Sequence, residues 1–277
     1  MVGIGTADMA MIAGRVDEQE AVRTIHAALD AGVTLIDTAD TYAPRPDAVG
    51  HGERLVAKAL ASSPGDASAV LVATKFGHTR TREGGWLLDG RPEHVRRACD
   101  ASLGALGVEA IGLYQYHRPD PRVPYQETIH ALRELWDAGK VRLVGVANAD
   151  LQQIQMARQV LGNGGLAAVQ NEFSPWHRSS EPELRHCAQH GIAFLPWGPL
   201  GGLRRAGGLA TRFPAIGLIA AARGVSPQQT CLAWMLHLAP NVIPLVGASR
   251  PETIRDSAAA DLDLTPQELE LLETEGI

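Results

Sequence analysis

The chain has 277 residues, of which 45% are hydrophobic and 20% are charged, and its formal net charge is -6 at pH 7. This composition is typical of a globular protein with a sizeable core, and one (β/α)₈ barrel of about 250 residues fits the length. The acidic balance argues against a nucleic-acid or acidic-membrane surface and is compatible with a local basic site for a small anion.

The first residues contain no basic segment followed by an apolar core, and no apolar run approaches the ~20 residues that cross a bilayer. We therefore expect a cytoplasmic protein with no membrane segment. Cys99, Cys187 and Cys231 lie far apart and none belongs to a CxxC pair. Their spacing predicts buried free thiols, with no disulfide framework and no metal site.

Short β-branched runs alternate with longer helical patterns almost from end to end. Pro244 interrupts the last of these runs, and proline is tolerated mainly at strand starts and edges. Three capping-box patterns predict helix starts, at Asp17 with Glu20, Ser226 with Gln229, and Thr265 with Glu268. We predict strands at residues 2–5, 33–37, 70–74, 110–116, 141–146, 167–171, 192–196 and 242–246.

Strands joined by helical crossovers must pair in parallel, which suits either a doubly wound sheet or a closed barrel. A dinucleotide-binding Rossmann unit would carry GxGxxG after its first strand, and this chain has no such motif there. We therefore predict an α/β fold of the (β/α)₈, or TIM, barrel type, forming a single domain over residues 1–277.

Titratable side chains stand at the ends of three successive predicted strands. Asp37 ends the second strand, with Tyr42 in the loop that follows; Lys75 ends the third, and His117 ends the fourth. Each residue alone also has a structural reading, such as a loop cap. Because active sites of (β/α)₈ barrels lie at the C-terminal ends of the strands, we expect the four to form one site.

This set of side chains suits the reduction of a carbonyl. The ammonium of Lys75 would lower the pKa of the Tyr42 phenol, whose reference value is about 10, and Asp37 would hold Lys75 protonated. His117 could hydrogen-bond the substrate oxygen while Tyr42 donates a proton to it. None of these residues supplies a hydride, so we expect a cofactor.

Two late segments carry the features of a phosphate site. Phosphates in these barrels often bind after strands seven and eight. The first segment, 198–205, is rich in glycine and contains Arg204 and Arg205, which could equally belong to a solvated loop. In the second, Ser249 and Arg250 precede Pro251, which opens a helix whose N-terminal N–H groups could bind an anion.

The chain resembles the aldo-keto reductase superfamily from Gly3 to its end. The motifs that carry this resemblance are GVTLIDTADTY at 32–42, VATKFG at 72–77, YQYHRPD at 114–120, VQNE at 169–172 and PWGPLG at 196–201. The resemblance implies that Asp37, Tyr42, Lys75 and His117 form the catalytic tetrad. It also implies NADPH-dependent reduction of a small aldehyde or ketone to an alcohol.

The resemblance assigns further residues to the NADPH/NADP+ site. Asn148 and Gln170 would bind the carboxamide, Trp197 would stack on the nicotinamide, and Ser249 and Arg250 would hold the 2′-phosphate. The pyrophosphate would lie along Gly198, Pro199, Leu200 and Gly201, and the remaining candidates are Gly5, Thr6 and Asp37.

Several positions depart from the family pattern and bear on cofactor preference and substrate range. Ala147 and Gly198 stand where serine is common, and Thr253 stands where many members have a second phosphate-binding arginine. The N-terminal hairpin that usually plugs the barrel bottom is expected to be missing, since Met1 falls almost on the first strand. The long C-terminal tail of many members is expected to be missing as well.

Two other functions fit parts of this pattern. Lys75 at a strand end could form a Schiff base, as in an aldolase, and some relatives of the family are regulatory subunits of potassium channels. The aromatic residues His78, Trp86 and Trp176 could line a substrate pocket or simply cover the barrel rim. No sequence feature indicates an oligomeric state.

Overall fold

The computed structural model describes residues 2–7, 9, 17–202 and 204–277. Parallel strands form one eight-stranded sheet with the order β10-β1-β2-β3-β6-β7-β8-β9. Parallel bridges from Phe194 to Val242 and from Trp197 to Leu245 join the two ends of this order and close the barrel. The strands are β1 (Gly3–Gly5), β2 (Leu35–Asp37), β3 (Leu71–Phe76), β6 (Ile111–Tyr116), β7 (Val141–Ala147), β8 (Leu166–Gln170), β9 (Ala193–Phe194) and β10 (Leu245–Gly247).

Each predicted strand segment overlaps one of these strands, so the (β/α)₈ prediction is confirmed. The last strand is shorter than predicted, because Pro244 has no N–H for the ladder and β10 begins only at Leu245. The carbonyl of Pro244 still accepts a hydrogen bond from the Gly3 amide at 2.9 Å. The proline therefore lies directly before the strand, where its missing N–H interrupts no ladder hydrogen bond.

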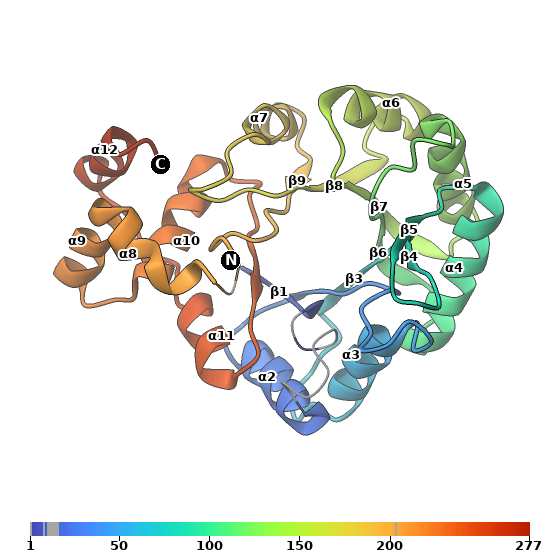
Figure 1. The fold of residues 1–277 in the computed structure, drawn as a ribbon, viewed down its shortest axis with the longest axis horizontal. Helices are drawn as coiled ribbons and strands as arrows, with labels where there is room; N and C mark the ends of the chain where they lie inside the picture. Colours follow the sequence, from blue (N-terminus) through green and yellow to red (C-terminus); the bar gives the residue numbers. More distant parts are fainter. Residues whose placement is uncertain (1, 8, 10–16, 203) are drawn as a thin grey trace.

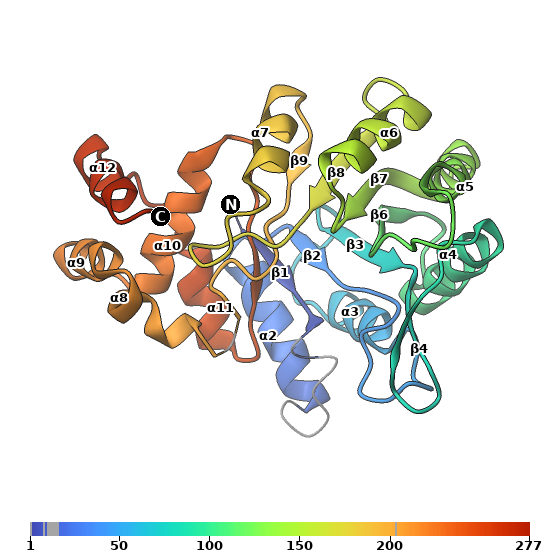
Figure 2. The same ribbon diagram turned by 45° about the horizontal axis from the view of Figure 1, so that its top comes forward.

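Helices surround the strands, and Figures 1 and 2 show those from α2 to α7 following one another around the barrel. Within the described residues, no helix combines the length and apolar character needed to cross a bilayer. The outer helices are α2 (Glu18–Asp30), α3 (His51–Ala61), α4 (Pro92–Leu106), α5 (Tyr125–Asp137), α6 (Leu151–Leu161), α7 (Glu181–Gln189), α10 (Pro227–Leu238) and α11 (Pro251–Ala258). The short α8 (Leu209–Arg212) and α9 (Pro214–Arg223) pack against α10. The short η1 (Ala206–Gly208) contacts α8, and α12 (Pro266–Thr274) contacts α9.

The three predicted capping boxes are realised to different degrees. The box at Thr265 and Glu268 forms in both directions. Asp17 accepts the Glu20 N–H at 2.6 Å, whereas the Glu20 side chain pairs with Arg23. The second half of the box predicted at Ser226 is wrong, because the Gln229 side chain donates to the Asp256 carbonyl at 2.9 Å and so ties α10 to α11.

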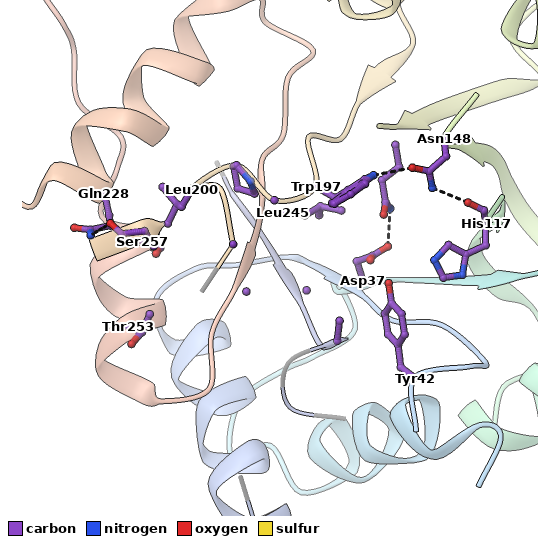
Figure 3. Close-up of a pocket in the computed structure, with 18 of the residues that line it drawn as sticks. Asp37, Tyr42, His117, Asn148, Trp197, Leu200, Gln228, Leu245, Thr253 and Ser257 are labelled. Carbon is purple, nitrogen blue, oxygen red and sulfur yellow. Dashed lines mark hydrogen bonds between the residues drawn. The ribbon is translucent and has the colours of Figure 1, made fainter. Parts of the chain in front are cut away.

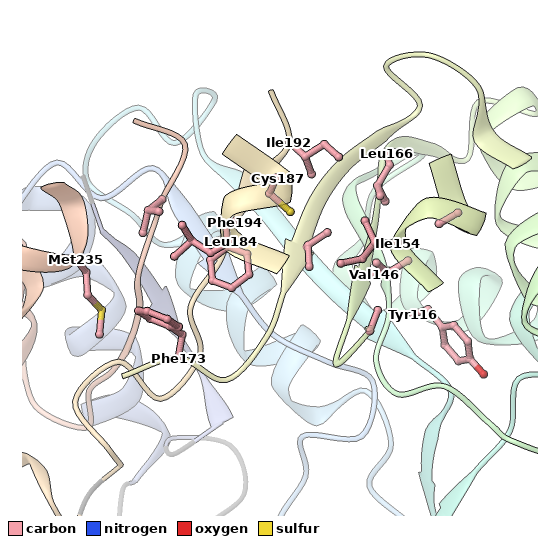
Figure 4. Packing of buried hydrophobic residues seen from close by; sticks show 14 of the residues in the cluster. Tyr116, Val146, Ile154, Leu166, Phe173, Leu184, Cys187, Ile192, Phe194 and Met235 are labelled. Atoms are coloured by element: carbon pink, nitrogen blue, oxygen red, sulfur yellow. The ribbon is translucent and has the colours of Figure 1, made fainter. Parts of the chain in front are cut away.

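The strands are buried on both faces, as parallel strands usually are. The face toward the helices packs into a large cluster that includes Phe173 and Phe194 and the predicted free thiols Cys99, Cys187 and Cys231, all buried (Figure 4). The barrel interior holds a small apolar cluster of Leu35, Ala73, Leu113, Ala168, Leu195 and Leu245.

The interior changes character two residues further along the strands. Since side chains alternate between the two faces of a strand, the residue after next points into the barrel as well. These positions carry Asp37, Lys75, Gln115, Gln170, Trp197 and Gly247, and four of the six are charged residues or amides. The apolar cluster therefore forms the floor of a polar layer at the C-terminal ends of the strands.

The segment after β3 was not among the predicted strands, but it forms an antiparallel hairpin of β4 (His78–Arg80) and β5 (Trp86–Leu88). Its strands span only three residues each, so they show too little alternation to be recognised. The Arg80 side chain donates to the Ala43 carbonyl at 3.1 Å and ties the hairpin to the loop after β2.

Candidate active site

A cavity of about 750 Å³ opens at the C-terminal ends of the strands. Figure 3 shows its elongated shape: Asp37, Tyr42 and His117 lie at one end, and Gln228, Thr253 and Ser257 lie at the other. The first end is built from β2, β6 and the loops that follow them, and the second from α10 and α11. One continuous cavity therefore joins the predicted catalytic residues to the predicted phosphate site.

Most of the predicted site residues line this cavity. Thr6 and Lys75 are buried beneath it, and Gly201 and Ser249 lie outside its described lining. The predicted residues in the lining are Gly5, Asp37, Tyr42, His117, Asn148, Gln170, Trp197, Gly198, Pro199, Leu200 and Arg250.

The Lys75 side chain is fully buried and has three partners. Its Nζ lies 2.5 Å from Asp37 Oδ1, 2.8 Å from the Thr38 carbonyl oxygen and 3.3 Å from the Tyr42 hydroxyl. The exposed fractions of the Lys75 and Asp37 side chains are 0% and 5%. The geometry therefore holds a buried cation against the phenol oxygen, which in turn faces the cavity.

The pKa values of this pair follow from burial and charge together. Burial acts to lower the pKa of Lys75, but Asp37 and the Tyr42 oxygen outweigh it, so the pKa is raised and the amine is charged. The pKa of Tyr42 is also raised, because burial outweighs the opposing effect of Lys75. The lowered pKa expected for Tyr42 from the ammonium alone is wrong, because burial has the larger effect. Tyr42 consequently holds its proton at neutral pH.

His117 is a neutral group in this environment. Burial lowers its pKa well below the usual value, and the positive charge of Lys75 acts in the same direction. The imidazole meets the Tyr42 ring edge to face, with 5.7 Å between ring centroids. Its Nδ1 is buried without a hydrogen-bond partner among the described residues. A neutral imidazole beside a protonated phenol can hydrogen-bond a ligand oxygen without adding charge.

Gln115 contacts Asp37 inside the barrel, and the strand-end pattern did not predict it. Its Nε2 donates to Asp37 Oδ2 at 3.1 Å, and Gln170 Nε2 donates to the same oxygen at 2.9 Å. A Cβ at Gly145 would come within 2.9 Å of Gln115 Cγ, so this glycine leaves the space that Gln115 occupies. The signal was the alternation in β6, which places Leu113, Gln115 and His117 on the same face.

Asn148 connects two walls of the cavity. Its Oδ1 accepts from Trp197 Nε1 at 3.1 Å, and its Nδ2 donates to the His117 carbonyl at 2.8 Å (Figure 3). Among the described residues, Asn148 is the one non-glycine residue with a positive φ, which is 53°. Asparagine tolerates this left-handed conformation better than most residues. The local backbone at the end of β7 thus directs the amide toward Trp197.

The loop after β9 approaches the cavity through its backbone. Gly198, Gly201 and Gly202 have φ values of 65°, 75° and 79°, which favour glycine, and the Gly201 amide donates to the Gly198 carbonyl at 2.8 Å. A Cβ at Gly201 would meet the Trp176 ring at 2.7 Å. Trp176 packs there and against Phe213, outside the described cavity lining, so it covers the rim.

The far end of the cavity contains charges of both signs. Arg250 is the N-cap residue of α11 and lines the cavity, and Pro251 occupies the first turn as predicted. Glu252, Thr253 and Asp256 line the same end. Asp256 accepts from the Ser226 hydroxyl at 2.7 Å. An anion bound here would meet a guanidinium and free helix N–H groups, but also two neighbouring carboxylates.

Comparisons with known proteins agree with this geometry. The family model described as aldo/keto reductase family matches residues 1–274. An uncharacterized oxidoreductase of Schizosaccharomyces pombe is 30% identical over 261 residues, which cover 94% of this chain and 80% of that protein. The chain belongs to the aldo/keto reductase family, a family of oxidoreductases.

Solved structures show the same fold. A glycerol dehydrogenase from Gluconobacter oxydans matches with a TM-score of 0.83 and 30% identity, covering 99% of this chain and 90% of that one. An aldo/keto reductase from Klebsiella pneumoniae in complex with NADP and acetate matches with a TM-score of 0.80, 30% identity and the same coverage. The resemblance read from the motifs is therefore confirmed.

A buried carboxyl group lies behind the site. Asp40 is buried, its amide donates to the Lys75 carbonyl at 3.2 Å, and its Oδ1 has no partner among the described residues. Burial raises the pKa of Asp40 well above its usual value, and the nearby Glu53 raises it further. The folded chain therefore binds this proton more tightly than the unfolded chain does.

This difference predicts a pH-dependent effect of Asp40→Asn on stability. Because the pKa of Asp40 is higher in the folded chain, its protonated carboxyl stabilises the fold. This contribution is fully present below the unfolded pKa of about 3.9, and it is lost as pH rises toward the folded pKa. Asparagine has no such loss, so the melting temperature of the variant relative to wild type should rise between pH 5 and pH 8. The matched control is Asp66→Asn, an exposed loop residue whose pKa is lowered by the Ser68 N–H. A difference for Asp40→Asn that stays constant with pH would contradict the assignment.

Proposed function

We propose that this protein reduces a small aldehyde or ketone to an alcohol with NADPH, and that Tyr42 is the general acid. One observation carries the proposal: Tyr42 lines the cavity, and its hydroxyl lies 3.3 Å from the Nζ of Lys75, which in turn contacts Asp37. A side chain in this position can give its proton to a substrate oxygen and then be stabilised as a phenolate by Lys75.

The chain's residues fit a nicotinamide dinucleotide. Gln170 uses its amide N–H groups on Asp37 and Gln115, which leaves its Oε1, to which no described residue donates, for the carboxamide of a ligand. Trp197 offers a ring fixed by Asn148, and the loop at Gly198 offers backbone without side chains. The Klebsiella pneumoniae structure with NADP supports the same cofactor. Bound NADPH would supply the hydride.

The remaining side chains then have separate roles. His117, neutral because of burial and the charge of Lys75, would hydrogen-bond the carbonyl oxygen and orient it toward Tyr42. Asp37 would keep Lys75 charged, and Gln115 and Gln170 would hold the second oxygen of Asp37. The same groups can run the reverse reaction, in which Tyr42 takes the proton from an alcohol. The glycerol dehydrogenase among the structural relatives is consistent with either direction.

Replacement of Tyr42 by phenylalanine tests the central assignment. Tyr42→Phe removes the proton donor and keeps the ring, so we expect carbonyl reduction to fall by at least about two orders of magnitude, the low end for general-acid catalysis. NADPH binding, followed by fluorescence quenching, should persist. Tyr125→Phe is the control, because it also removes a buried tyrosine hydroxyl. That hydroxyl has no hydrogen-bond partner among the described residues, and Tyr125 is not among the described residues that line the cavity. Activity of Tyr42→Phe within a few-fold of wild type would mean that another group is the acid.

The aldolase alternative requires Lys75 as a free amine that can attack a carbonyl. The observed Nζ has three hydrogen-bond partners and a raised pKa, and its side chain is 0% exposed, which favours a charged positioning group. Borohydride added during turnover should therefore leave Lys75 unmodified, as read by mass spectrometry of its peptide. A covalent substrate adduct on Lys75 would support the aldolase. NADPH binding without turnover of any carbonyl would instead support a regulatory role.

Cofactor preference should depend on Arg250 and its acidic neighbour. A hydrogen bond to a charged group is worth about 1.5–3 kcal/mol, so Arg250→Ala should weaken NADPH binding roughly ten- to hundredfold and leave NADH nearly unchanged. Glu252→Gln should strengthen NADPH binding by up to about fivefold, the range of an exposed charge interaction. Arg255→Ala, exposed on the same helix, is the control. Calorimetric titration of each variant with NADPH and with NADH measures these affinities. Equal losses of affinity for both cofactors in Arg250→Ala would mean that Arg250 only supports the loop.

A further inference from the structure

Arg118 is a cation in the cavity wall that the proposed reaction does not use. It follows His117 directly at the end of β6 and lines the cavity together with Tyr42, His78, Trp86 and His117. Its side chain is partly buried. Within the part of the chain that the structure describes, its guanidinium has no ion pair and no hydrogen bond.

Other arginines around this end of the barrel have partners. Arg122 pairs with Asp120 at 2.9 Å, and Arg91 pairs with Asp89 at 2.6 Å. Arg80 stacks over the Trp86 ring at 5.0 Å and donates to the Ala43 carbonyl. Arg118 differs from them because it faces the cavity and lacks a described partner. A partly buried cation is costly without an anion, and a ligand could supply one.

The other groups at this end leave a net positive charge. Asp37 is neutralised by Lys75. Burial lowers the pKa of His78 to about 4, and Arg118 acts in the same direction, so this imidazole is neutral. His117 is neutral for the reasons given above. Among the described residues that line this end, Arg118 therefore carries the uncompensated charge.

An apolar surface lies beside this charge. The rings of His78 and Trp86 stack with 4.3 Å between their centroids, and the His78 ring meets the His117 ring edge to face at 5.1 Å. His78 and Trp86 belong to the β4–β5 hairpin, and both line the cavity. A flat or extended apolar group could pack against this pair between the tetrad and Arg118.

We propose that the preferred substrates are aldehydes or ketones that carry a carboxylate, and that Arg118 binds this carboxylate while the carbonyl lies at Tyr42 and His117. This inference rests on the proposed carbonyl reduction and adds its substrate class. The planar guanidinium matches a carboxylate with two parallel hydrogen bonds, which a lysine ammonium cannot reproduce. A short apolar segment would connect the two ends of the substrate along His78 and Trp86.

A pair of aldehydes of the same shape tests this assignment. 4-Carboxybenzaldehyde carries the charge, and 4-carbamoylbenzaldehyde replaces the carboxylate by a neutral amide. For wild type with saturating NADPH, we expect kcat/KM to favour the carboxylate about ten- to hundredfold, as for a charge-assisted hydrogen bond. This ratio should decrease with added salt.

Variants then assign the preference to Arg118. In Arg118→Gln the ratio should fall to near one, whatever the variant does to the amide substrate, and Arg118→Lys should give an intermediate ratio. Arg82→Gln, an exposed residue in the turn of the same hairpin, changes the net charge equally and should keep the wild-type ratio. NADPH binding and the melting temperature verify that each variant is folded.

The outcomes separate this inference from the proposed function. If wild type reduces both aldehydes with equal kcat/KM, the carboxylate assignment is wrong and the reductase assignment stands. If the preference exists but persists in Arg118→Gln, another group binds the carboxylate. If wild type reduces neither aldehyde nor any other carbonyl with NADPH, the proposed function fails and this inference fails with it.

Discussion

The buried ion pair between Lys75 and Asp37 is the constraint on which the site depends. Two charges removed from water destabilise the fold unless their remaining hydrogen-bonding groups are satisfied. Here the Thr38 carbonyl and the Tyr42 hydroxyl complete the lysine, and two amide groups complete the second oxygen of Asp37. The polar layer inside the barrel supplies these partners, and the proposed reaction would use a charge that the fold has already stabilised.

The sequence revealed those site residues whose position follows from strand ends. Asp37, Lys75 and His117 each stand where a buried run gives way to a loop, so the barrel rule brings them together without any contact information. Gln115 was missed because it lies within a strand and not at its end, although the alternation in β6 places it on the same face as His117. Its contact with Asp37 depends on the packing of β6 inside the barrel. Ser249 was expected to bind the 2′-phosphate, but it is not among the described lining residues, which in this region include Arg250 and residues of α11.

Other differences arise from forces that a local pattern does not contain. The raised pKa of Tyr42 depends on how completely the barrel encloses the phenol, which no spacing of residues reports. Gln229 leaves its capping position because α11 offers a carbonyl acceptor from a distant part of the chain. Tertiary contacts thus decide the final partners of polar groups, whereas local sequence decides where the elements begin and end.

Asn148 ties together two residues that line the cavity. Its side-chain amide accepts from the Trp197 indole and donates to the His117 carbonyl, and its backbone N–H donates to the Gln170 carbonyl at 2.9 Å. A left-handed residue has few alternative conformations, so this bridge resists small adjustments. In the proposed reaction, the spacing between a ring stacked on Trp197 and an oxygen held by His117 would consequently be set by the barrel itself. Substrates of different shape would then have to adapt to one fixed distance.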